Sequence, residues 1–116
     1  GLKTLLLAGR VKATTDAVIG TEAVASLQHY HFSKGFFGTN GITVEEGFTT
    51  PDIEEAMNKR VAMEHCRKCY VLADASKFEA LSNVSFAPLS KGVIITAAQE
   101  GLNVKPYKQH TEVIVL

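Results

Sequence analysis

The chain has 116 residues, of which 46% are hydrophobic, and 12 basic residues balance 12 acidic residues to give zero formal net charge. This length and composition fit one domain with its own hydrophobic core, and they exclude a disordered chain and a disulfide-stapled miniprotein. The balanced charge argues against a free-standing DNA-binding module, which usually carries a basic stripe, so any DNA contacts are expected outside this chain.

Neither a membrane span nor a secretory leader is visible in the sequence. Every apolar stretch is interrupted by Lys, Asp or Gly well before the roughly 20 residues that a bilayer span requires. The chain begins with Gly1 and shows no charged leader before an apolar segment. We therefore expect a cytoplasmic fragment of a longer protein without membrane attachment.

The first third of the chain reads as a strand, a helix and a second strand. Residues 4–9 form a short apolar run closed by glycine, which is typical of a core strand covered on both faces. Residues 19–30 carry apolar side chains at helical spacing, after a Thr-Glu pair that favours a helix start. Residues 36–38 then resume a strand, and residues 42–47 read as an excursion with turn chemistry.

A long helix is predicted over residues 53–69, with Pro51 at a first-turn position where its missing N–H costs nothing. The later predicted elements are a strand at 70–73, a broken apolar segment at 84–89, a strand at 92–96, a short helix at 97–102 and a strand at 111–116. Strands that alternate with helices predict an α/β fold with a parallel-dominated, Rossmann-like sheet and flanking helices. No repeat or linker divides residues 1–116, so one unit is expected.

The two cysteines form a single C-x-x-C at the end of the predicted long helix. Cys66 and Cys69 lack a second cysteine pair or a histidine at zinc-finger spacing. The four histidines also lack the spacing of a metal site. We interpret the cysteines as structural thiols, with redox pairing as the alternative, and we expect no metal and no cofactor.

The most informative stretch is the apolar run at residues 71–73, which ends abruptly in Asp74, Ser76 and Lys77. Open α/β sheets bind ligands at the carboxyl ends of their strands, so these polar groups predict a binding site. The carboxylate of Asp74 suits sugar hydroxyls, and the ammonium of Lys77 suits an anion. The alternative is a helix-capping Asp with a solvated Lys.

A second polar stop follows the strand at residues 36–38. Gly38 and Gly41 bracket Thr39 and Asn40, and short side chains with exposed backbone N–H groups suit hydroxyls or phosphate oxygens. The alternative is an ordinary Asn-Gly turn, which is a common hairpin signal. Two such stops favour one shared site.

Four blocks of the sequence resemble, in order and spacing, the effector-sensing domain of the DeoR family of bacterial transcription regulators. The blocks are Phe-Ser-Lys-Gly-Phe-Phe-Gly-Thr-Asn-Gly-Ile at 32–42, Gly-Phe-Thr-Thr at 47–50, Glu-Glu-Ala-Met-Asn-Lys-Arg at 54–60 and Leu-Ala-Asp-Ala-Ser-Lys-Phe at 72–78. The resemblance extends from about Leu7 to the C-terminus.

This resemblance implies a fold similar to ribose-5-phosphate isomerase and CoA-transferases, and a sensor rather than an enzyme. A phosphorylated sugar would be the effector, and a helix-turn-helix outside this chain would bind operator DNA in a repressor that is a homo-oligomer. The family domain normally starts further upstream, with an Asp-x-Gly-Thr-Thr loop that helps to hold the phosphate. No such loop occurs here, so the resemblance implies a truncated form of the domain.

By the same resemblance, six residues are assigned to ligand binding: Gly38, Asn40, Gly41, Lys59, Asp74 and Lys77. Lys59 is favoured over Arg60 as the helix residue that points at the pocket, although a helix charge is most often a solvated face. Thr49 and Thr50 are further hydroxyl candidates. The family usually shows Ile-Thr-Asp after the penultimate strand, whereas this chain has Ile-Thr-Ala at 95–97, which removes an acidic group there.

Two other functions compete with sensing. An isomerase acting on sugar phosphates would use the carboxylate beside the ammonium to move protons. Glu45 and Glu46 are candidates for a second carboxylate near the first loop, but a flexible turn positions them poorly for a general base. A purely structural dimerisation fragment would associate through an unprotected sheet edge. The identity of the sugar does not follow from the sequence.

Overall fold

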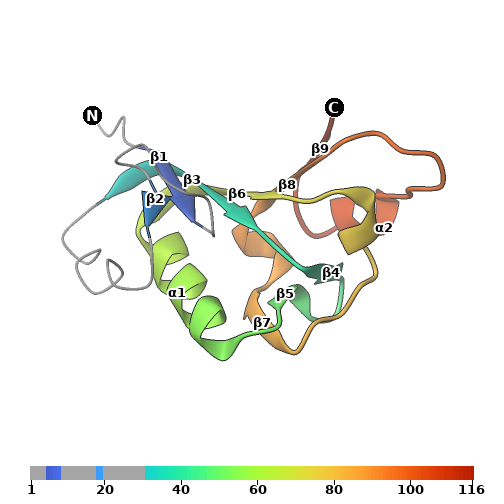
Figure 1. The fold of residues 1–116 in the computed structure, drawn as a ribbon. Coiled ribbons are helices and arrows are strands. Elements are labelled where there is room, and N and C mark those ends of the chain that lie inside the picture. Colours follow the sequence, from blue (N-terminus) through green and yellow to red (C-terminus); the bar gives the residue numbers. More distant parts are fainter. Residues whose placement is uncertain (1–4, 9–17, 20–30) are drawn as a thin grey trace.

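A parallel sheet dominates the computed structural model, which describes residues 5–8, 18–19 and 31–116. Six strands of the described chain pair in parallel in the order β2-β1-β3-β6-β8-β9 (Figure 1). Their bounds are Leu5–Ala8 (β1), Val18–Ile19 (β2), Phe32–Gly38 (β3), Cys66–Leu72 (β6), Val93–Thr96 (β8) and Val113–Val115 (β9). The α/β fold and the strands predicted at 4–9, 36–38, 70–73, 92–96 and 111–116 are confirmed.

The strand order places a topological switch point beside β1. The chain pairs β2 on one side of β1 and then pairs β3 on the other side, after which β6, β8 and β9 follow outward in sequence. In open parallel sheets a ligand crevice forms outside the carboxyl ends of the strands at such a point. The topology therefore predicts that residues directly after β3 lie near a ligand site.

A small antiparallel sheet follows β3 directly. It contains β4 (Gly41–Thr43), β5 (Gly47–Thr50) and β7 (Val84–Ala87), in the order β4-β5-β7. The turn of the β4–β5 hairpin lies between Thr43 and Gly47, so residues 42–47 include a turn, as predicted. Gly41 already pairs with Thr49, and the Asn-Gly pair at 40–41 therefore leads into the hairpin instead of forming its turn.

Helix α1 (Ile53–Glu64) begins at an Asp N-cap and is shorter than predicted. Asp52 accepts a hydrogen bond from the backbone N–H of Glu54, which places Pro51 before the cap and not in the first turn. The predicted helix at residues 65–69 is wrong, because Cys66 already pairs with Phe32 in the parallel ladder. Local sequence does not reveal this pairing. The contact with β3, which is distant in sequence, makes residues 66–69 a strand.

The core lies on one face of the large sheet. Phe37, Val71 and Ile94 are neighbours in register on β3, β6 and β8, and each is at most 1% exposed. Helix α1 and the small sheet lie on the same side of the large sheet (Figure 1). The rings of Phe48 and Phe86, from β5 and β7, stack with centroids 6.0 Å apart in the same buried cluster. The small sheet is therefore tied to the large one by apolar packing.

The C-terminal region differs from the prediction at two points. Residues 97–102 are not helical, since Gly101 adopts a left-handed backbone angle of φ +84° that interrupts a helix. The only α-helix after α1 in the described chain is the short α2 (Lys105–Lys108), which carries the buried Tyr107. The helix predicted at 19–30 begins in β2 at Ile19, and its remainder lies outside the described residues.

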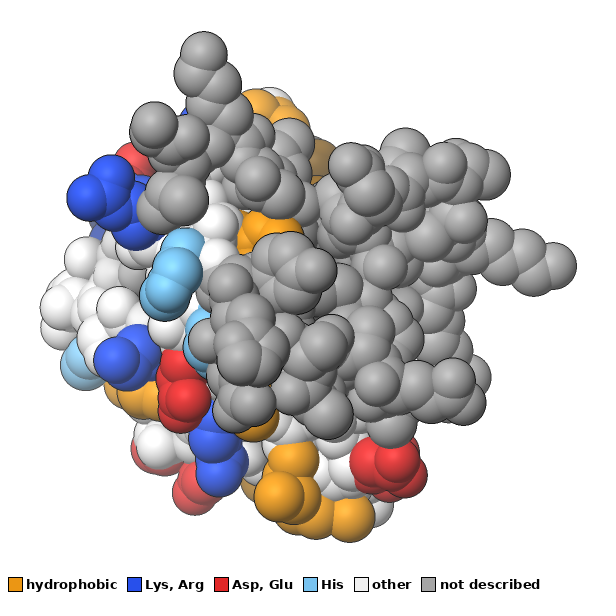
Figure 2. All heavy atoms as spheres, turned by 90° about the vertical axis from the view of Figure 1, so that its left-hand side faces the viewer, with side chains coloured by type: hydrophobic (Ala, Val, Ile, Leu, Met, Phe, Trp, Pro, Cys, Tyr) orange, Lys and Arg blue, Asp and Glu red, His pale blue; other side chains and the backbone are white. Residues whose placement is uncertain are grey.

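The described surface agrees with the balanced charge of the sequence. Basic, acidic and histidine side chains are interspersed among the described residues on the face drawn in Figure 2. Within the described part of the chain, no helix is both long enough and apolar enough to cross a membrane.

Candidate functional site

The two polar stops of the sequence meet at the carboxyl edge of the sheet. Gly38, the last residue of β3, pairs with Leu72, the last residue of β6, so both strands end together. The segments that follow stay in contact, since Ile42 and Phe78 form a parallel bridge and the N–H of Glu79 donates to the carbonyl of Ile42 over 2.8 Å. The structure thus brings the loop at residues 38–41 and the turn at residues 74–79 together.

The loop at residues 38–41 is held by its own hydroxyls and by β5. Thr39 Oγ1 donates to the carbonyls of Gly41 and Thr49 at 2.9 and 3.1 Å, and the N–H of Asn40 donates to Thr49 at 2.9 Å. Thr50 Oγ1 donates to the side-chain oxygen of Asn40 at 3.3 Å. The Thr49 carbonyl and the Thr50 hydroxyl thus hold the loop, whereas the Thr49 hydroxyl accepts from the N–H of Ser82 at 3.0 Å. Because Thr49 and Thr50 are fully buried, neither hydroxyl is exposed to a ligand.

The two glycines of this loop play different roles. A Cβ at Gly41 would lie 2.2 Å from the carbonyl oxygen of Ala80 and 2.6 Å from Thr49 Oγ1, so only glycine lets the two segments approach this closely. A Cβ at Gly38 would meet no described atom within 4 Å. Gly38 is exposed, and this side of the loop is therefore open to a ligand.

Lys59 reaches the loop from α1, yet its ammonium is already engaged. The side chain is 5% exposed, and Nζ donates to the carbonyl of Gly38 at 2.7 Å. Nζ also lies 3.3 Å from a carboxylate oxygen of Glu55 and 5.0 Å from the centre of the Phe86 ring. Burial lowers the pKa of Lys59, and Glu55 opposes that shift. Lys59 therefore supports the loop, whereas Arg60 turns away to the carbonyls of Ser85 and Phe86.

The turn after β6 is a short 3₁₀ helix, η2 (Ala75–Lys77), with Asp74 as its N-cap. Asp74 Oδ1 accepts from the N–H of Ser76 at 2.9 Å and also from the Ser76 hydroxyl. The hydroxyl of Ser76, followed by its N–H, lowers the pKa of Asp74. Asp74 is exposed, so the capping role leaves its carboxylate accessible as an anion.

A cavity of about 710 Å³, here called the carboxyl-edge cavity, opens beside this turn. Residues of the turn form one wall, and residues that follow β8 form the other. The lining residues are Asp74, Ala75, Ser76, Phe78, Glu79, Gln99, Glu100, Gly101, Leu102, Asn103, Pro106 and Tyr107. Of the six residues assigned from the sequence, only Asp74 lines it, although the loop at 38–41 lies next to the wall.

Glu79 and Tyr107 fix the base of the carboxyl-edge cavity. Tyr107 donates to a carboxylate oxygen of Glu79 at 2.7 Å, and the N–H of Glu79 donates back to the Tyr107 oxygen at 3.2 Å. Glu79 holds a left-handed backbone angle of φ 64°, which is strained for a residue with a side chain. Burial, with Glu79 adding to it, raises the pKa of Tyr107. Strain that persists in this way is typical of binding sites.

The second wall of the cavity falls largely within the predicted helix at 97–102, which the structure does not contain. Its run Gln-Glu-Gly-Leu-Asn at 99–103 is a third polar stop after a strand, in this case β8. The rule that identified Asp74 would have identified this run as well. Glu79 gave no local signal, because its place depends on the bridge between Ile42 and Phe78.

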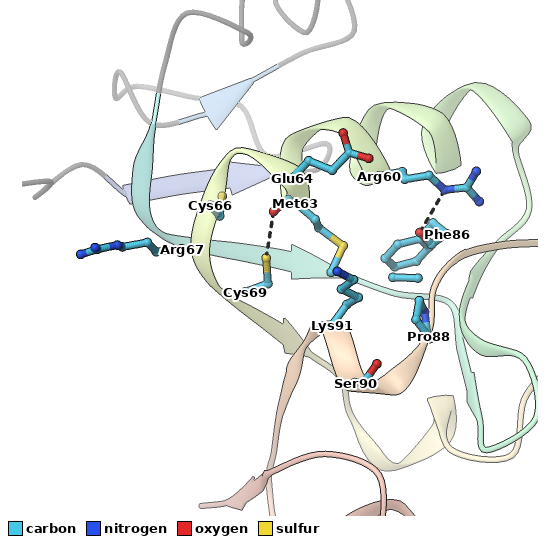
Figure 3. A pocket seen from close by; sticks show the side chains of 11 residues that line it. Arg60, Met63, Glu64, Cys66, Arg67, Cys69, Phe86, Pro88, Ser90 and Lys91 are labelled. Atoms are coloured by element: carbon cyan, nitrogen blue, oxygen red, sulfur yellow. Dashed lines mark hydrogen bonds between the residues drawn. The ribbon is translucent and has the colours of Figure 1, made fainter.

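A second cavity, of about 590 Å³, lies at the opposite edge, where β6 and β8 begin (Figure 3). Both free cysteines line it, together with Arg67 and Lys91. Cys66 and Cys69 donate to the carbonyls of Ala62 and Met63 at 3.3 and 3.5 Å. These carbonyls belong to the last turn of α1, where the N–H of the C-cap residue His65 also donates to them.

The two thiols interact with each other as well as with the helix. The neighbouring Cys69 thiol raises the pKa of Cys66, and the neighbouring Cys66 thiol lowers the pKa of Cys69. Among the described residues, no group of three His, Cys, Asp or Glu side chains is placed to hold a metal ion. The contacts with the carbonyls of α1 are those of structural thiols, and they lie in β6 instead of at a helix end as predicted.

Comparison with known proteins matches residues 1–97 to the model of the DeoR C terminal sensor domain. The chain is 43% identical over 111 residues to an uncharacterized HTH-type transcriptional regulator FruR of Bacillus subtilis, a match that covers 96% of this chain and 44% of that protein. It is 36% identical to the HTH-type transcriptional regulator GlpR of Haloferax volcanii, over 74% of this chain and 34% of that protein.

A third relative is the lactose phosphotransferase system repressor of Streptococcus mutans, which is 32% identical over 94% of this chain and 43% of the repressor. The chain therefore spans less than half the length of the curated relatives that it matches.

Proposed function

Because the chain belongs to the DeoR family of transcriptional regulators, as a C-terminal sensor domain, we propose that it binds a phosphorylated sugar for a repressor of sugar catabolism. The observation that supports this most directly is the contact at the carboxyl edge between Ile42, which directly follows the loop at 38–41, and Phe78 and Glu79 of the turn at 74–79. This edge is where open parallel sheets hold their ligands.

Each segment has a distinct part in the proposed site. Asp74 accepts hydrogen bonds from sugar hydroxyls, because its carboxylate is exposed and ionised. Lys77 and the exposed residues Gly38 and Asn40 face the phosphate, whereas the buried Gly41 contributes by allowing the close approach to Ala80. The buried Lys59 contributes by fixing the carbonyl of Gly38, not by contact with the ligand. The family's upstream phosphate loop completes the site from outside residues 1–116.

The same proposal extends to the whole regulator. A helix-turn-helix domain outside this chain binds operator DNA in the cytoplasm, in a homo-oligomer whose sensor domain is related in fold to ribose-5-phosphate isomerase and CoA-transferases. Ligand binding changes operator affinity only when the ligand has different affinities for two arrangements of the regulator. The sensor domain supplies this difference at the contact between the loop and the turn.

An isomerase is the competing function, because Glu79 places a second carboxylate in the same cavity as Asp74. The carboxylate of Glu79 is tied to the Tyr107 hydroxyl at 2.7 Å, which suits a fixed acceptor better than a proton-transfer base. The relatives are transcriptional regulators, and sensing is therefore favoured. Conversion of fructose 6-phosphate or glucose 6-phosphate by the purified regulator would decide for the enzyme.

A thermal-shift panel on the complete regulator tests the proposed function. Fructose 6-phosphate, fructose 1-phosphate and glucosamine 6-phosphate are compared with the same sugars lacking phosphate, because a ligand that binds the native state raises the melting temperature. We expect at least one phosphorylated sugar to raise it and the free sugars to leave it unchanged. The double variant Asp74→Ala and Lys77→Ala should abolish the response.

The matched control for that variant is Glu112→Ala with Lys108→Ala, which also removes one acidic and one basic side chain but outside both segments; Glu112 and Lys108 are both exposed. It should respond like the unmodified protein. A response to free sugars, or one that survives in the Asp74 and Lys77 variant, contradicts the proposed function.

A further inference from the structure

We propose that the carboxyl-edge cavity receives the end of the sugar opposite the phosphate and rejects a second anionic group there, so that the sensor selects sugars with a single phosphate. This inference rests on the proposed sugar-phosphate function and adds the orientation and charge class of the ligand. It concerns the cavity beside Asp74 and the wall that follows β8.

The first support for the inference is the negative charge of the residues that line the cavity. Asp74, Glu79 and Glu100 line the cavity, whereas no Lys, Arg or His belongs to the described residues that form it. The remaining polar lining residues include the amides of Gln99 and Asn103, which donate to and accept from hydroxyls. A second phosphate or a carboxylate placed here is repelled by fixed carboxylates, while a hydroxyl or an ammonium group is attracted.

Two of these carboxylates, those of Asp74 and Glu79, are also held in place, so they do not turn away from an approaching anion. Asp74 is fixed by two hydrogen bonds from Ser76, both to Oδ1. Glu79 is fixed by its left-handed backbone and by the hydroxyl of Tyr107, which is 1% exposed. A volume of about 710 Å³ is in the range of cavities that enclose small ligands, so a sugar ring fits without displacing these groups.

The cations of this edge lie outside the cavity. The ammonium of Lys59 is bound to the Gly38 carbonyl and paired with Glu55. Lys77 follows Asp74 by three positions, but it is not among the described lining residues. The single phosphate therefore belongs on the side of Lys77 and the loop at 38–41. The hydroxyl-bearing end then points toward Glu79 and Glu100.

The residues expected to control this selectivity lie in the wall of the cavity that follows β8. The match to the DeoR sensor model ends at residue 97, whereas Gln99, Glu100, Asn103 and Tyr107 of the cavity lie beyond it. The exposed Glu100 is next to Gly101, which adopts φ +84° and shapes the turn that presents the carboxylate. Glu100 is therefore the residue whose charge should act on ligand choice with the least effect on folding.

Isothermal titration calorimetry of the complete regulator tests this inference. The buffer contains EDTA so that no divalent cation bridges carboxylate and phosphate. Two ligand pairs are compared: fructose 6-phosphate with fructose 1,6-bisphosphate, and sorbitol 6-phosphate with 6-phosphogluconate, which differ in charge at nearly equal size. We expect the ligand with the extra anion to bind at least about tenfold more weakly in each pair that binds. Glu100→Gln should narrow that ratio several-fold, whereas the control Glu112→Gln should leave it unchanged.

The possible outcomes separate this inference from the function on which it rests. Equal affinity within each pair, or a ratio that Glu100→Gln does not narrow, overturns the inference while a monophosphate that binds keeps the proposed function. If no sugar phosphate binds at all, both are overturned.

Discussion

The loop at residues 38–41 and the turn at residues 74–79 follow neighbouring strands of one sheet. They differ in whether their polar groups are hydrogen-bonded inside the protein or exposed. Thr39 of the loop, and Thr49 and Thr50 of the adjoining strand β5, are buried and hydrogen-bonded to the protein itself. In the turn, Asp74 is exposed and uses one carboxylate oxygen for its cap. Adjacent segments with similar sequence chemistry thus divide into a braced support and a surface that is open to a ligand.

The difference teaches that polar residue types alone do not identify ligand contacts. A buried polar group must find a hydrogen-bond partner to avoid a desolvation penalty, and the threonines of the loop find theirs within the fold. Changes in the loop should therefore act first on stability. Changes in the turn should act first on ligand affinity.

The largest effect is expected from Gly41→Ala, because the added Cβ would lie 2.2 Å from the Ala80 carbonyl oxygen. The loop and the turn would have to separate, at a cost of about 3 kcal/mol in the free energy of unfolding. Urea denaturation measures the change. Gly38→Ala is the matched control, since its Cβ meets no described atom within 4 Å, and it should remain within about 0.5 kcal/mol of the parent. Equal losses in both variants would show that the close approach is not what makes residue 41 a glycine.

The next effect is expected from Lys59→Met, which keeps an unbranched side chain but removes the ammonium that binds Gly38. The variant leaves the carbonyl of Gly38 without this donor, but it also removes a charge that is only 5% exposed. Because the relief of burying that charge offsets part of the lost hydrogen bond, we expect a net cost of about 1 kcal/mol at neutral pH. Lys108→Met, at an exposed position, is the control and should change stability by less than about 0.5 kcal/mol.

The same pair of variants gives a pH test with a definite sign. Burial lowers the pKa of Lys59 below the ordinary lysine value of 10.5. Between the lowered pKa and 10.5 the unfolded chain holds this proton and the folded chain does not, so stability rises with pH across that window. The stability of the parent relative to Lys59→Met should therefore increase as pH approaches 10.5. A decrease would show that the ammonium gains more from Glu55 and Gly38 than it loses by burial.

The elements that the sequence predicted correctly are those with local signals. Apolar runs closed by glycine or a polar stop were sufficient for β1, β6 and β8, because a strand buried on both faces needs such a run. The strand at Cys66 was missed because its pairing with Phe32 joins residues 34 positions apart. A periodic apolar pattern fits a helix and a strand equally well over so few residues.

The candidate site was predictable to a similar extent. Asp74 was identified as a polar stop, and the structure shows it at a cavity. Lys59 was also expected to point at the pocket, but its distance from Gly38 and its burial show that it supports the loop. Whether a lysine contacts a ligand or a carbonyl depends on tertiary packing, which the spacing of charges along a helix does not contain. The contribution of Glu79 depends on tertiary packing in the same way.

An effect of similar size is expected at Thr96, the last residue of β8, which shares the burial of the loop but lacks its hydrogen bonds. Thr96 is 3% exposed, and its Oγ1 is the only buried side-chain oxygen or nitrogen of the described residues without a hydrogen-bond partner. Thr96→Val should therefore stabilise the fold by about 1 kcal/mol.

Thr111→Val is the matched control for that substitution, because Thr111 Oγ1 donates to the carbonyl of Gly92 at 2.6 Å. It should destabilise the fold by about 1 kcal/mol. Thermal denaturation of both variants decides the point. Destabilisation by Thr96→Val would mean that the Thr96 hydroxyl has a hydrogen-bond partner. The hydroxyl of Thr96 would then not differ from the hydrogen-bonded hydroxyl of Thr39 in the loop.

The smallest effect is expected from Ser76→Ala, which acts only on the titration of the exposed Asp74. The Ser76 hydroxyl is the largest cause that lowers the pKa of Asp74 below 3.8, so its removal should raise that pKa toward the ordinary value. A carboxyl group with a depressed pKa contributes stability above its unfolded pKa and loses it as pH falls through the folded one, so Ser76→Ala should shift the onset of that loss to higher pH. An NMR titration of the Asp74 carboxyl carbon measures this directly, with Ser90→Ala, at an exposed serine far from the turn, as the control. An unchanged titration would mean that the backbone N–H of Ser76 alone keeps Asp74 ionised, and ligand affinity at neutral pH should then be the same in both variants.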